Sequence, residues 1–414
     1  MNSSNSSQQP RVIVLGAGIG GLATAAALHA VGIAAHLYEA AADIVPADTG
    51  LELGSNANAT LRALGVDLNV IGRPARQLEV CGPRGGVIRR MNVADMGVEL
   101  GAATAGVHRR TLCAALRRAA PNCRVTTGTR AVGFDMPATG GVRVHFADGH
   151  HTTGDLLIGA DGFDSVVRAR VQPARPPITY DQLTWQGTAD LRHQRITPGW
   201  IGHYWGTGQR FGMIELGGGK VSWWATTTMP AAAAGAWAGT REDVLAHYDG
   251  WASEVRAAIE ATPRSALVAE PARDRDFGAE WGYGPVTMLG DAAHPMLPGL
   301  NHGAAAAIED AYVLAHSLAL QLNGDRDLVA ALRHYEHRRI PRTRRLVEES
   351  RRLARTGSIT NPVLRRGRDI AIGYSPNGLI RRITMDPMRF RVEPLPTVRT
   401  GGPARYSGSQ GLLR

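Results

Sequence analysis

The sequence predicts an α/β fold: a parallel sheet with helices, interleaved with a domain built on an antiparallel β-sheet, and followed by C-terminal helices. Three observations predict this organisation. Short apolar strands alternate with helical patterns near both ends of residues 11–345. All eight tryptophans fall between Trp185 and Trp281, in runs with strand-like composition. A charged helical pattern covers residues 338–355.

These patterns also predict where the domains begin and end. We expect the parallel-sheet domain to be discontinuous and the antiparallel sheet to be inserted into it. The predicted ranges are a disordered tail at 1–10, a parallel-sheet domain at 11–75, 101–178 and 282–345, an antiparallel-sheet domain at 76–100 and 179–281, and a helical or irregular extension at 346–414.

Composition excludes several classes of protein. The chain has 414 residues, 44% hydrophobic and 20% charged, which excludes wholesale disorder. No apolar run approaches the ~18 residues of a membrane span, so we expect none. The net charge is +10, but the arginines are scattered and no nucleic-acid-binding motif occurs. We therefore expect no nucleic-acid partner and interpret residues 338–355 as a solvated helix face.

The cysteines indicate a reducing compartment. Only Cys81, Cys113 and Cys123 occur, and no two form a CxxC pair. Neither a disulfide framework nor a metal site is expected, which favours the cytoplasm. The oligomeric state stays open between monomer and homodimer.

The first βα unit carries a dinucleotide-binding pattern. An apolar strand at 11–16 leads into Gly16-Ala-Gly18-Ile-Gly-Gly21, a helix to about residue 31 and a second strand that ends at Glu39. We expect Gly16 to permit the tight turn, Gly18 to let a pyrophosphate approach the backbone, and Gly21 to allow close helix–strand packing. Glu39 is expected to accept the hydroxyls of a ribose. FAD and NAD both remain possible from this unit alone.

Two further strand–loop–helix units follow. In residues 155–168 a buried strand ends at Asp161-Gly162, with Asp164 as the expected N-cap of the next helix. In residues 286–303 a strand ends at Gly290-Asp291, and a loop runs through His294, Pro298 and Asn301-His302-Gly303 into a helix over 304–320. Strand ends at the carboxyl edge of an α/β sheet are where such sheets bind ligands.

These three motifs, in this order, resemble the group A FAD-dependent aromatic monooxygenases of the salicylate hydroxylase and para-hydroxybenzoate hydroxylase type. The resemblance covers residues 10–345 and implies an FAD-binding, Rossmann-like parallel sheet of the GR2 type. It implies that Asp161-Gly162 approaches the pyrophosphate region and that Asp291 holds the ribityl chain. It also implies that Arg109, in Arg109-Arg110-Thr111-Leu112, contacts FAD. The cofactor residues that we expect are Gly16, Gly18, Gly21, Glu39, Arg109, Asp161, Gly162, Gly290, Asp291, Pro298 and Gly303.

The same resemblance implies the reaction. NADH or NADPH would bind transiently and reduce FAD, and O2 would react to give a C4a-hydroperoxyflavin that hydroxylates a small aromatic or heteroaromatic substrate. The sequence departs from the family pattern at two places, so the resemblance implies the cofactor more firmly than the substrate class. The flavin-facing loop ends in Asn301-His302-Gly303 instead of the usual Gln-Gly, and Gln186-Gly187 stands where Arg-Gly is common. A flavin-dependent halogenase or prenyl-chain reductase, or a catalytically silent flavin-binding protein, remain alternatives.

The candidates for catalysis and substrate binding are less constrained. His302 is the catalytic candidate, either as a group that polarises flavin or substrate or as a residue that braces its loop. His294 is expected to have a structural role. Trp223 and Trp224 must point to opposite faces of a strand. Arg210 could hold a carboxylate, although we favour a solvated strand arginine. The substrate-pocket candidates are Trp185, His203, Tyr204, Arg210, Trp223 and Trp224.

Overall fold

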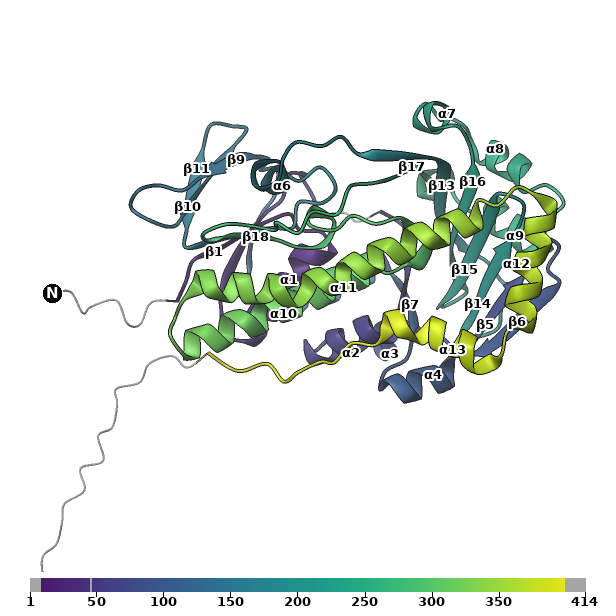
Figure 1. The fold of residues 1–414 in the computed structure, drawn as a ribbon, viewed down its shortest axis with the longest axis horizontal. Coiled ribbons are helices and arrows are strands. Elements are labelled where there is room, and N and C mark those ends of the chain that lie inside the picture. Colours follow the sequence, from purple (N-terminus) through teal and green to yellow (C-terminus); the bar gives the residue numbers. More distant parts are fainter. Residues whose placement is uncertain (1–8, 45–46, 399–414) are drawn as a thin grey trace, which may run out of the picture.

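The structure, a computed structural model, describes residues 9–44 and 47–398. Most of the predicted tail at 1–10 and the end of the predicted extension at 346–414 lie outside these residues. Figure 1 shows strands β1 (Val12–Leu15) and β18 (Val286–Met288) toward one end of the molecule and the large sheet toward the other. The long helix α11 (Leu328–Gly357) runs between them.

A five-stranded parallel sheet carries the predicted nucleotide-binding units, as expected. Its strands are short, and the two at Val12–Leu15 and Leu156–Gly159 are fully buried. Their order is β18, β12 (Leu156–Gly159), β1, β2 (Ala35–Tyr38) and β8 (Arg124–Thr126). Strand β1 therefore lies in the middle, paired with β12 on one side and β2 on the other.

The tryptophan-rich segment forms a seven-stranded sheet. All of its neighbouring pairs are antiparallel except β14 with β5, which pair in parallel. Strands β5 and β6 come from the predicted range 76–100, and the others from 178–274. The order is β17 (Val268–Asp274), β13 (Ile178–Asp190), β16 (Lys220–Thr228), β15 (Gln209–Gly217), β14 (Trp200–Trp205), β5 (Gln77–Cys81) and β6 (Val87–Asn92).

Two three-stranded sheets and shorter helices complete the described chain. The sheets are β11 (His151–Gly154), β10 (Val142–Phe146) and β9 (Ala131–Asp135), and β3 (Gly50–Leu53), β7 (Ala105–His108) and β4 (Arg73–Pro74). The shorter helices are α2 (Ser55–Ala63), α3 (Leu68–Ile71), α4 (Val93–Leu100), α6 (Val166–Val171), α7 (Ala231–Gly235), α8 (Arg241–His247), α9 (Ser253–Glu260), and 3-10 turns at Arg264–Ala266, Pro298–Leu300 and Asp386–Met388. Within the described residues, none of the helices has the length and apolar character that crossing a bilayer requires.

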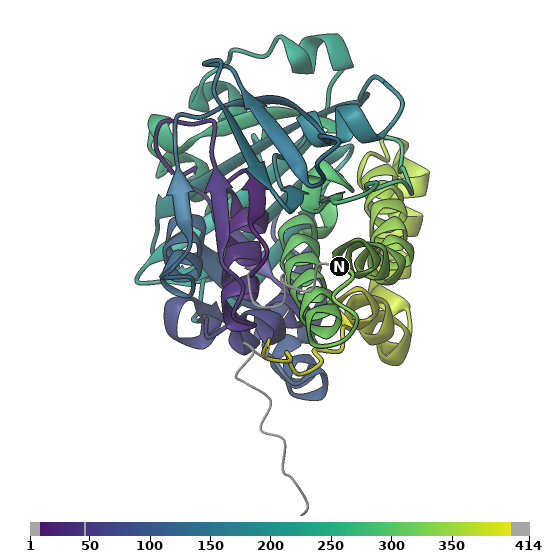
Figure 2. The same ribbon diagram turned by 90° about the vertical axis from the view of Figure 1, so that its left-hand side faces the viewer.

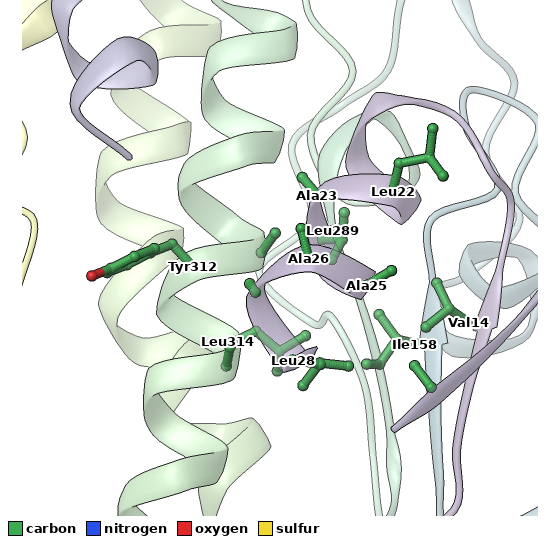
Figure 3. Close-up of a cluster of buried hydrophobic side chains, with 14 of the residues drawn as sticks. Val14, Leu22, Ala23, Ala25, Ala26, Leu28, Ile158, Leu289, Tyr312 and Leu314 are labelled. Atoms are coloured by element: carbon green, nitrogen blue, oxygen red, sulfur yellow. The ribbon is translucent and has the colours of Figure 1, made fainter. Parts of the chain in front are cut away.

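The main core forms where helix α1 (Ile19–Ala30) packs between the parallel sheet and helix α10 (Gly303–Asn323). Figure 3 shows Leu22 and Leu28 of α1 among Val14 and Ile158 of the sheet and Leu314 of α10. The small alanines of α1 allow α10 to approach closely. Their packing fixes the first turns of both helices relative to the sheet edge.

Helices α10 and α11 lie side by side (Figure 2) and share a buried ion-pair cluster. Arg339 of α11, 1% exposed, contacts Glu309 at 2.7 Å and Asp310 at 2.6 Å. The interpretation of residues 338–355 as a wholly solvated face is therefore wrong at Arg339. Acids on α10, far away in sequence, pair with it. Helix α11 continues unbroken through Pro341 and past residue 345 to Gly357.

Candidate active site

The first glycine turn has the geometry that the sequence predicted. Gly16 has φ +97°, and a Cβ there would lie 2.3 Å from the Ala160 carbonyl oxygen. A Cβ on Gly21 would lie 2.0 Å from the Gly16 oxygen. At Gly18, by contrast, a Cβ would meet nothing within 4 Å. Gly16 and Gly21 thus allow tight packing of the chain, whereas Gly18 leaves open space at the N-terminus of α1 for a ligand.

Glu39 lies at the end of β2, beside this turn. Its carboxylate accepts hydrogen bonds from the backbone N–H groups of Ala17, at 2.7 Å, and Ala41, at 2.9 Å. These bonds hold the carboxylate against the glycine turn. The position is suitable for the ribose contact that we proposed, and it also links the ends of β1 and β2.

The second strand end presents Asp161 and Gly162. Asp161 Oδ2 accepts from Val166 N at 2.8 Å, while its buried Oδ1 has no partner among the described residues. Burial raises the pKa of Asp161. The predicted N-cap at Asp164 is wrong: Ser165 caps the helix, because its Oγ accepts from the N–H of Arg168, and the Asp164 carboxylate pairs instead with Arg275.

The third strand end is held by Asp310 of α10. Asp310 Oδ2 accepts from Gly290 N at 3.0 Å and contacts His294 Nε2 at 2.5 Å, which gives His294 a structural position. Burial alone would raise the pKa of Asp310, but the charges of His294 and Arg339 outweigh it and lower the pKa to about 2. This arrangement fixes the turn Gly290–Ala292 and points Asp291 into open space.

Two arginines, Arg168 of α6 and Arg109 of helix α5 (Arg109–Arg118), lie near the third strand end. Arg109, the first residue of α5, has a buried Nε with no partner among the described residues. Arg168 donates to the carbonyl oxygens of Asp291 and Ala292, both at 3.0 Å. Asp291 lines the cavity, where desolvation by the surrounding protein raises its pKa, while the charges of His294, Arg109 and Arg168 oppose that shift.

One cavity of about 350 Å³ extends from these strand ends to the large sheet. Its cofactor-side wall contains seven of the residues predicted for FAD: Gly18, Arg109, Gly162, Gly290, Asp291, Pro298 and Gly303. Gly16, Gly21, Glu39 and Asp161 lie behind this wall and shape it. The opposite wall comes from the large sheet and includes Thr184, Gln186, Met213, Ile214, Ser222, Trp224 and Thr226.

The residues fit FAD. The open space at Gly18, the unpartnered Arg109 Nε and Asp161 Oδ1, and the N-terminus of the 21-residue helix α10 all lie at one edge of the sheet. Backbone N–H groups and the positive end of a helix dipole suit phosphates and a negatively charged ring edge. Asp291 and Glu39 supply acceptors for hydroxyl groups.

Some of the substrate-pocket candidates face the cavity, and others lie on the opposite face of the large sheet. Trp224 lines the cavity, with its ring 5.7 Å from that of His203. The indole of Trp223 points to the opposite face, where Nε1 donates to Thr262 Oγ1 at 2.8 Å. Trp223 also borders the cavity wall. The opposite directions agree with the alternation of a β-strand.

Two substrate-pocket candidates were wrong. Trp185 is fully buried against Trp237 and Tyr248 on the far face of the sheet. Tyr204 is also fully buried there, and its hydroxyl donates to Glu254 Oε1 at 2.6 Å. Helices α7, α8 and α9 cover that face, so it has its own aromatic core. Composition alone could not tell one sheet face from the other.

Arg210 is buried, so the interpretation as a solvated strand arginine is wrong. It is 3% exposed, and its guanidinium lies 4.2 Å from the Trp205 ring centroid and 4.8 Å from that of Trp224. It forms no ion pair with any described residue. Burial, with the nearby Arg368 charge, lowers the pKa of Arg210 to about 9, which leaves it cationic at neutral pH. A Cβ at Gly299, on the cavity wall, would lie 3.3 Å from Arg210 Nη1.

Glu52 of β3 is a cavity residue that the sequence analysis missed. Its Oε2 lies 3.5 Å from His203 Nε2 and accepts a hydrogen bond from Asn301 Nδ2 at 3.2 Å. Burial alone would raise the pKa of Glu52. The hydrogen bonds and charges of His203, His302 and Asn301 outweigh this effect, so the pKa of Glu52 lies below its usual value. The only local signal was an acid between Leu51 and Leu53 in an apolar strand, which also suits a surface position.

His302 caps α10 but is not part of the cavity wall. Its Nδ1 lies 2.7 Å from the Leu300 carbonyl oxygen, and its buried Nε2 has no partner among the described residues. Burial lowers the pKa of His302, so the ring is neutral at pH 7. This geometry favours a role in bracing the loop. The catalytic role stays a prediction.

Fold and site together define a flavin-dependent oxidoreductase, with the cofactor between a parallel sheet and a substrate-facing antiparallel sheet. The chain matches the FAD binding domain family over residues 9–350 and belongs to that family. This confirms the predicted resemblance, the fold class and FAD as the cofactor. Use of NADH or NADPH as electron donor is typical of this family.

Named relatives agree. The chain is 35% identical over 353 residues to aurachin C monooxygenase/isomerase of Stigmatella aurantiaca, covering 84% of this chain and 90% of the relative. It is 33% identical over 354 residues to 3-amino-4-hydroxybenzoate 2-monooxygenase of Streptomyces cremeus, covering 83% and 86%. Klebsiella pneumoniae HpxO, solved with FAD and uric acid, matches with a TM-score of 0.82 and 26% identity over 94% of this chain and 98% of that one. The relatives are FAD-dependent monooxygenases, and this chain is an oxidoreductase of that class.

Proposed function

We propose that the protein uses NADH or NADPH and O2 to hydroxylate a small aromatic or heteroaromatic ring that carries both an N–H or O–H donor and an oxygen acceptor. The observation that carries the proposal is the single cavity shared by the FAD-binding residues and the large sheet. A ring bound there lies against the cofactor without a further opening of the fold. Bound FAD supplies the redox chemistry, taking electrons from the nicotinamide and activating O2.

The protein residues have separate proposed roles. Gly18 and the start of α1 accommodate the pyrophosphate, Glu39 the adenosine ribose, and Asp291 the ribityl hydroxyls. Arg109 contributes positive charge on the same side. The N-terminus of α10, at Gly303, directs its dipole toward the cavity and stabilises negative charge on the flavin ring.

On the sheet side, Trp224 provides a flat apolar surface for the substrate ring. Glu52, ionised at neutral pH, is the acceptor for the N–H or O–H donor of the ring. Arg210 is a buried cation without an ion pair, placed just behind Gly299, and it favours an anionic or carbonyl oxygen at that end. Two of the named relatives support this class: 3-amino-4-hydroxybenzoate is the substrate in one name, and HpxO was solved with uric acid.

We place the reaction in the cytoplasm, where NADH and NADPH are available and the three free cysteines stay reduced.

The test is a turnover screen with the FAD-reconstituted protein. Hydroxybenzoates, quinolones, purines and hydroxypyridines are added singly, and NADH and NADPH oxidation, hydrogen peroxide and product mass are followed. The proposal predicts that one ring class stimulates oxidation and gains one oxygen atom. Flavin binding without any NAD(P)H oxidation would indicate a silent flavin-binding protein. A product that gains halogen in the presence of halide would indicate a halogenase.

The assignment of Arg210 has its own test. Arg210→Met keeps an apolar side chain between the two indoles but removes the charge. We expect KM for the identified substrate to rise roughly 10- to 100-fold, as for the loss of a charged hydrogen bond, with FAD still bound. Arg192→Met, at an exposed arginine, is the matched control. An unchanged KM in Arg210→Met would remove Arg210 from the substrate site.

A further inference from the structure

The two helices that follow α11 have their apolar residues on the outside. They are α12 (Pro362–Tyr374) and α13 (Asn377–Met385), at the outer edge of the molecule beside β6 and α4 (Figure 1). On α12, Val363 is 76% exposed, Ile370 50% and Tyr374 86%. Their spacing of seven and four residues puts them on one helix face. Leu364 of α12 and Leu379 and Ile383 of α13 are exposed as well.

The inner face of α12 is polar at its centre. Arg368 is buried, donates to the Gly206 carbonyl oxygen at 3.3 Å and lies 5.1 Å from the Trp205 ring centroid. An ordinary surface helix buries its apolar face and exposes its charges. Here, the apolar stripe of α12 faces outward and an arginine faces inward. The stripe therefore is not needed to hold the helix on the protein.

The body of the protein holds both helices firmly in this orientation. Arg89 of β6 donates from Nε to the Ile372 carbonyl oxygen at 2.6 Å, from Nη1 to Asn377 Oδ1 at 2.9 Å and from Nη2 to the Gly373 carbonyl oxygen at 3.0 Å. Asn361 caps α12 by accepting from two backbone N–H groups. The exposed stripe is consequently a fixed surface and not a frayed end.

The charge around the stripe is positive. Residues 362–385 contain five arginines and one acid, Asp369. Arg368 pairs with Asp369, Arg381 with Glu99 and Arg382 with Asp386. Arg366, on the first turns of α12, is exposed and forms no ion pair with any described residue. Exposed apolar side chains edged by arginines are typical of helices that lie in the interface of an anionic bilayer.

We propose that α12 and α13 dock the protein onto the surface of a membrane that contains anionic phospholipids. The aromatic and aliphatic side chains of the stripe enter the headgroup region, and the exposed Arg366 and Arg382 contact lipid phosphates. A second copy of the chain is a poorer partner for this surface. A symmetric contact would place the unpaired Arg366 of two copies close together, while Asp369, Glu99 and Asp386 are already paired with arginines of the same copy.

Docking would also orient the catalytic cavity. Arg368 and Arg210 both lie over the Trp205 ring, and Arg210 lies over Trp224, which lines the cavity. The side chains of Trp205 and Arg210 thus connect the docked helix with Trp224 at the substrate end. This arrangement favours a ring substrate that reaches the cavity from the bilayer surface.

The test is vesicle co-sedimentation of the full-length FAD-bound protein. Vesicles of phosphatidylcholine mixed with phosphatidylglycerol are compared with vesicles of phosphatidylcholine alone. We expect binding to the anionic vesicles, weaker binding to the neutral ones, and loss of binding at high salt. Ile370→Ser combined with Tyr374→Ser should reduce the partition coefficient about tenfold or more. Because both side chains are exposed, we expect this double variant to fold and keep its flavin.

The matched control replaces two exposed apolar residues elsewhere: Val132→Ser with Leu320→Ser, at 56% and 44% exposure. This control should bind like wild type. The proposal is overturned if wild type stays in the supernatant with anionic vesicles, or if the Ile370/Tyr374 variant binds as well as wild type. It is also overturned, in favour of a second copy, if lipid-free wild type is a dimer that this variant dissociates. Since binding is measured without turnover, its failure leaves the proposed function untouched.

Discussion

The indole of Trp224 on β16 lies over Gly212, its partner in the register with β15. A Cβ at position 212 would be 2.3 Å from Trp224 Cε2, so only glycine leaves room for the ring. On the opposite face of the sheet, Gly187 makes room for Trp223 in the same way. A Cβ at position 187 would lie 2.7 Å from Trp223 Cε2. The two pairs differ in one respect. The Trp223 ring is buried and stacks on Phe211, whereas Trp224 is half-buried on the cavity side.

We predict different outcomes for Gly212→Ala and Gly187→Ala. In Gly212→Ala the Trp224 ring moves into the cavity, so FAD should still bind while substrate turnover and coupling fall. In Gly187→Ala the Trp223 ring has no space, and overpacking should cost about 1–3 kcal/mol of stability. Flavin content, product yield per NAD(P)H and urea unfolding measure the difference. Equal coupling in Gly212→Ala and wild type would show that Trp224 does not contact substrate.

Glu39→Ala should weaken FAD binding by about 1–3 kcal/mol, because it removes a charged acceptor and releases the Ala17 and Ala41 N–H groups. Titration of the apoprotein with FAD, followed by flavin fluorescence, measures this. Asp43→Ala, at an exposed acid four residues later, is the control. If FAD affinity is the same in Glu39→Ala as in wild type, Glu39 does not contact the ribose.

Glu52→Gln keeps the volume of the side chain but removes its charge. The pKa of Glu52 is lowered, so wild type keeps the carboxylate ionised at neutral pH. We expect KM for a donor-bearing ring to rise roughly 10- to 100-fold, with little change in FAD content. Steady-state kinetics at pH 7 with the substrate from the turnover screen provide the measurement. A lower flavin content at unchanged KM would assign Glu52 to the cofactor loop through Asn301.

Asp310→Asn should destabilise the protein by about 3–5 kcal/mol, because it leaves the buried Arg339 charge undercompensated. The folded pKa of Asp310, about 2, is below the unfolded value of about 3.9. Its stabilising effect is therefore present above pH 4 and lost as the pH falls toward 2.

Urea unfolding of wild type and Asp310→Asn across this pH range measures the prediction, and the stability difference should shrink as the pH falls. Asp325→Asn, at an exposed acid, is the control and should have little effect. A difference that is constant from pH 7 to pH 3 would contradict the ion-pair explanation.

His302→Gln separates the two interpretations of that residue. The bond from Nδ1 to Leu300 and the position outside the cavity wall predict a change in turnover of less than about tenfold and an unaltered pH profile between pH 6 and 8. A loss of about 10²-fold, or a pH profile that shifts in this range, would instead support direct contact with flavin or substrate. Product yield and hydrogen peroxide release give a second readout.

Much of the cofactor site could be predicted from local sequence. The roles of Gly16 and Gly21 follow from backbone geometry within a few residues, since a tight turn and a close helix–strand contact leave no room for a Cβ. Asp291 is placed by its position at the end of a short buried strand. Such features depend on neighbours along the chain, so the sequence by itself determined the parallel sheet, the binding edge and the class of cofactor.

The tertiary structure alone decided the substrate side. Both faces of β15 are covered, so its residues do not alternate between buried and exposed positions. The sequence of the strand therefore could not show that Arg210 is buried. Arg339 is buried because Glu309 and Asp310 reach it from another helix, and Glu52 faces the cavity because β3 pairs with β7. Burial of a charge is set by partners that are distant in sequence. Only the packing of the two sheets and the helix pair brings those partners together.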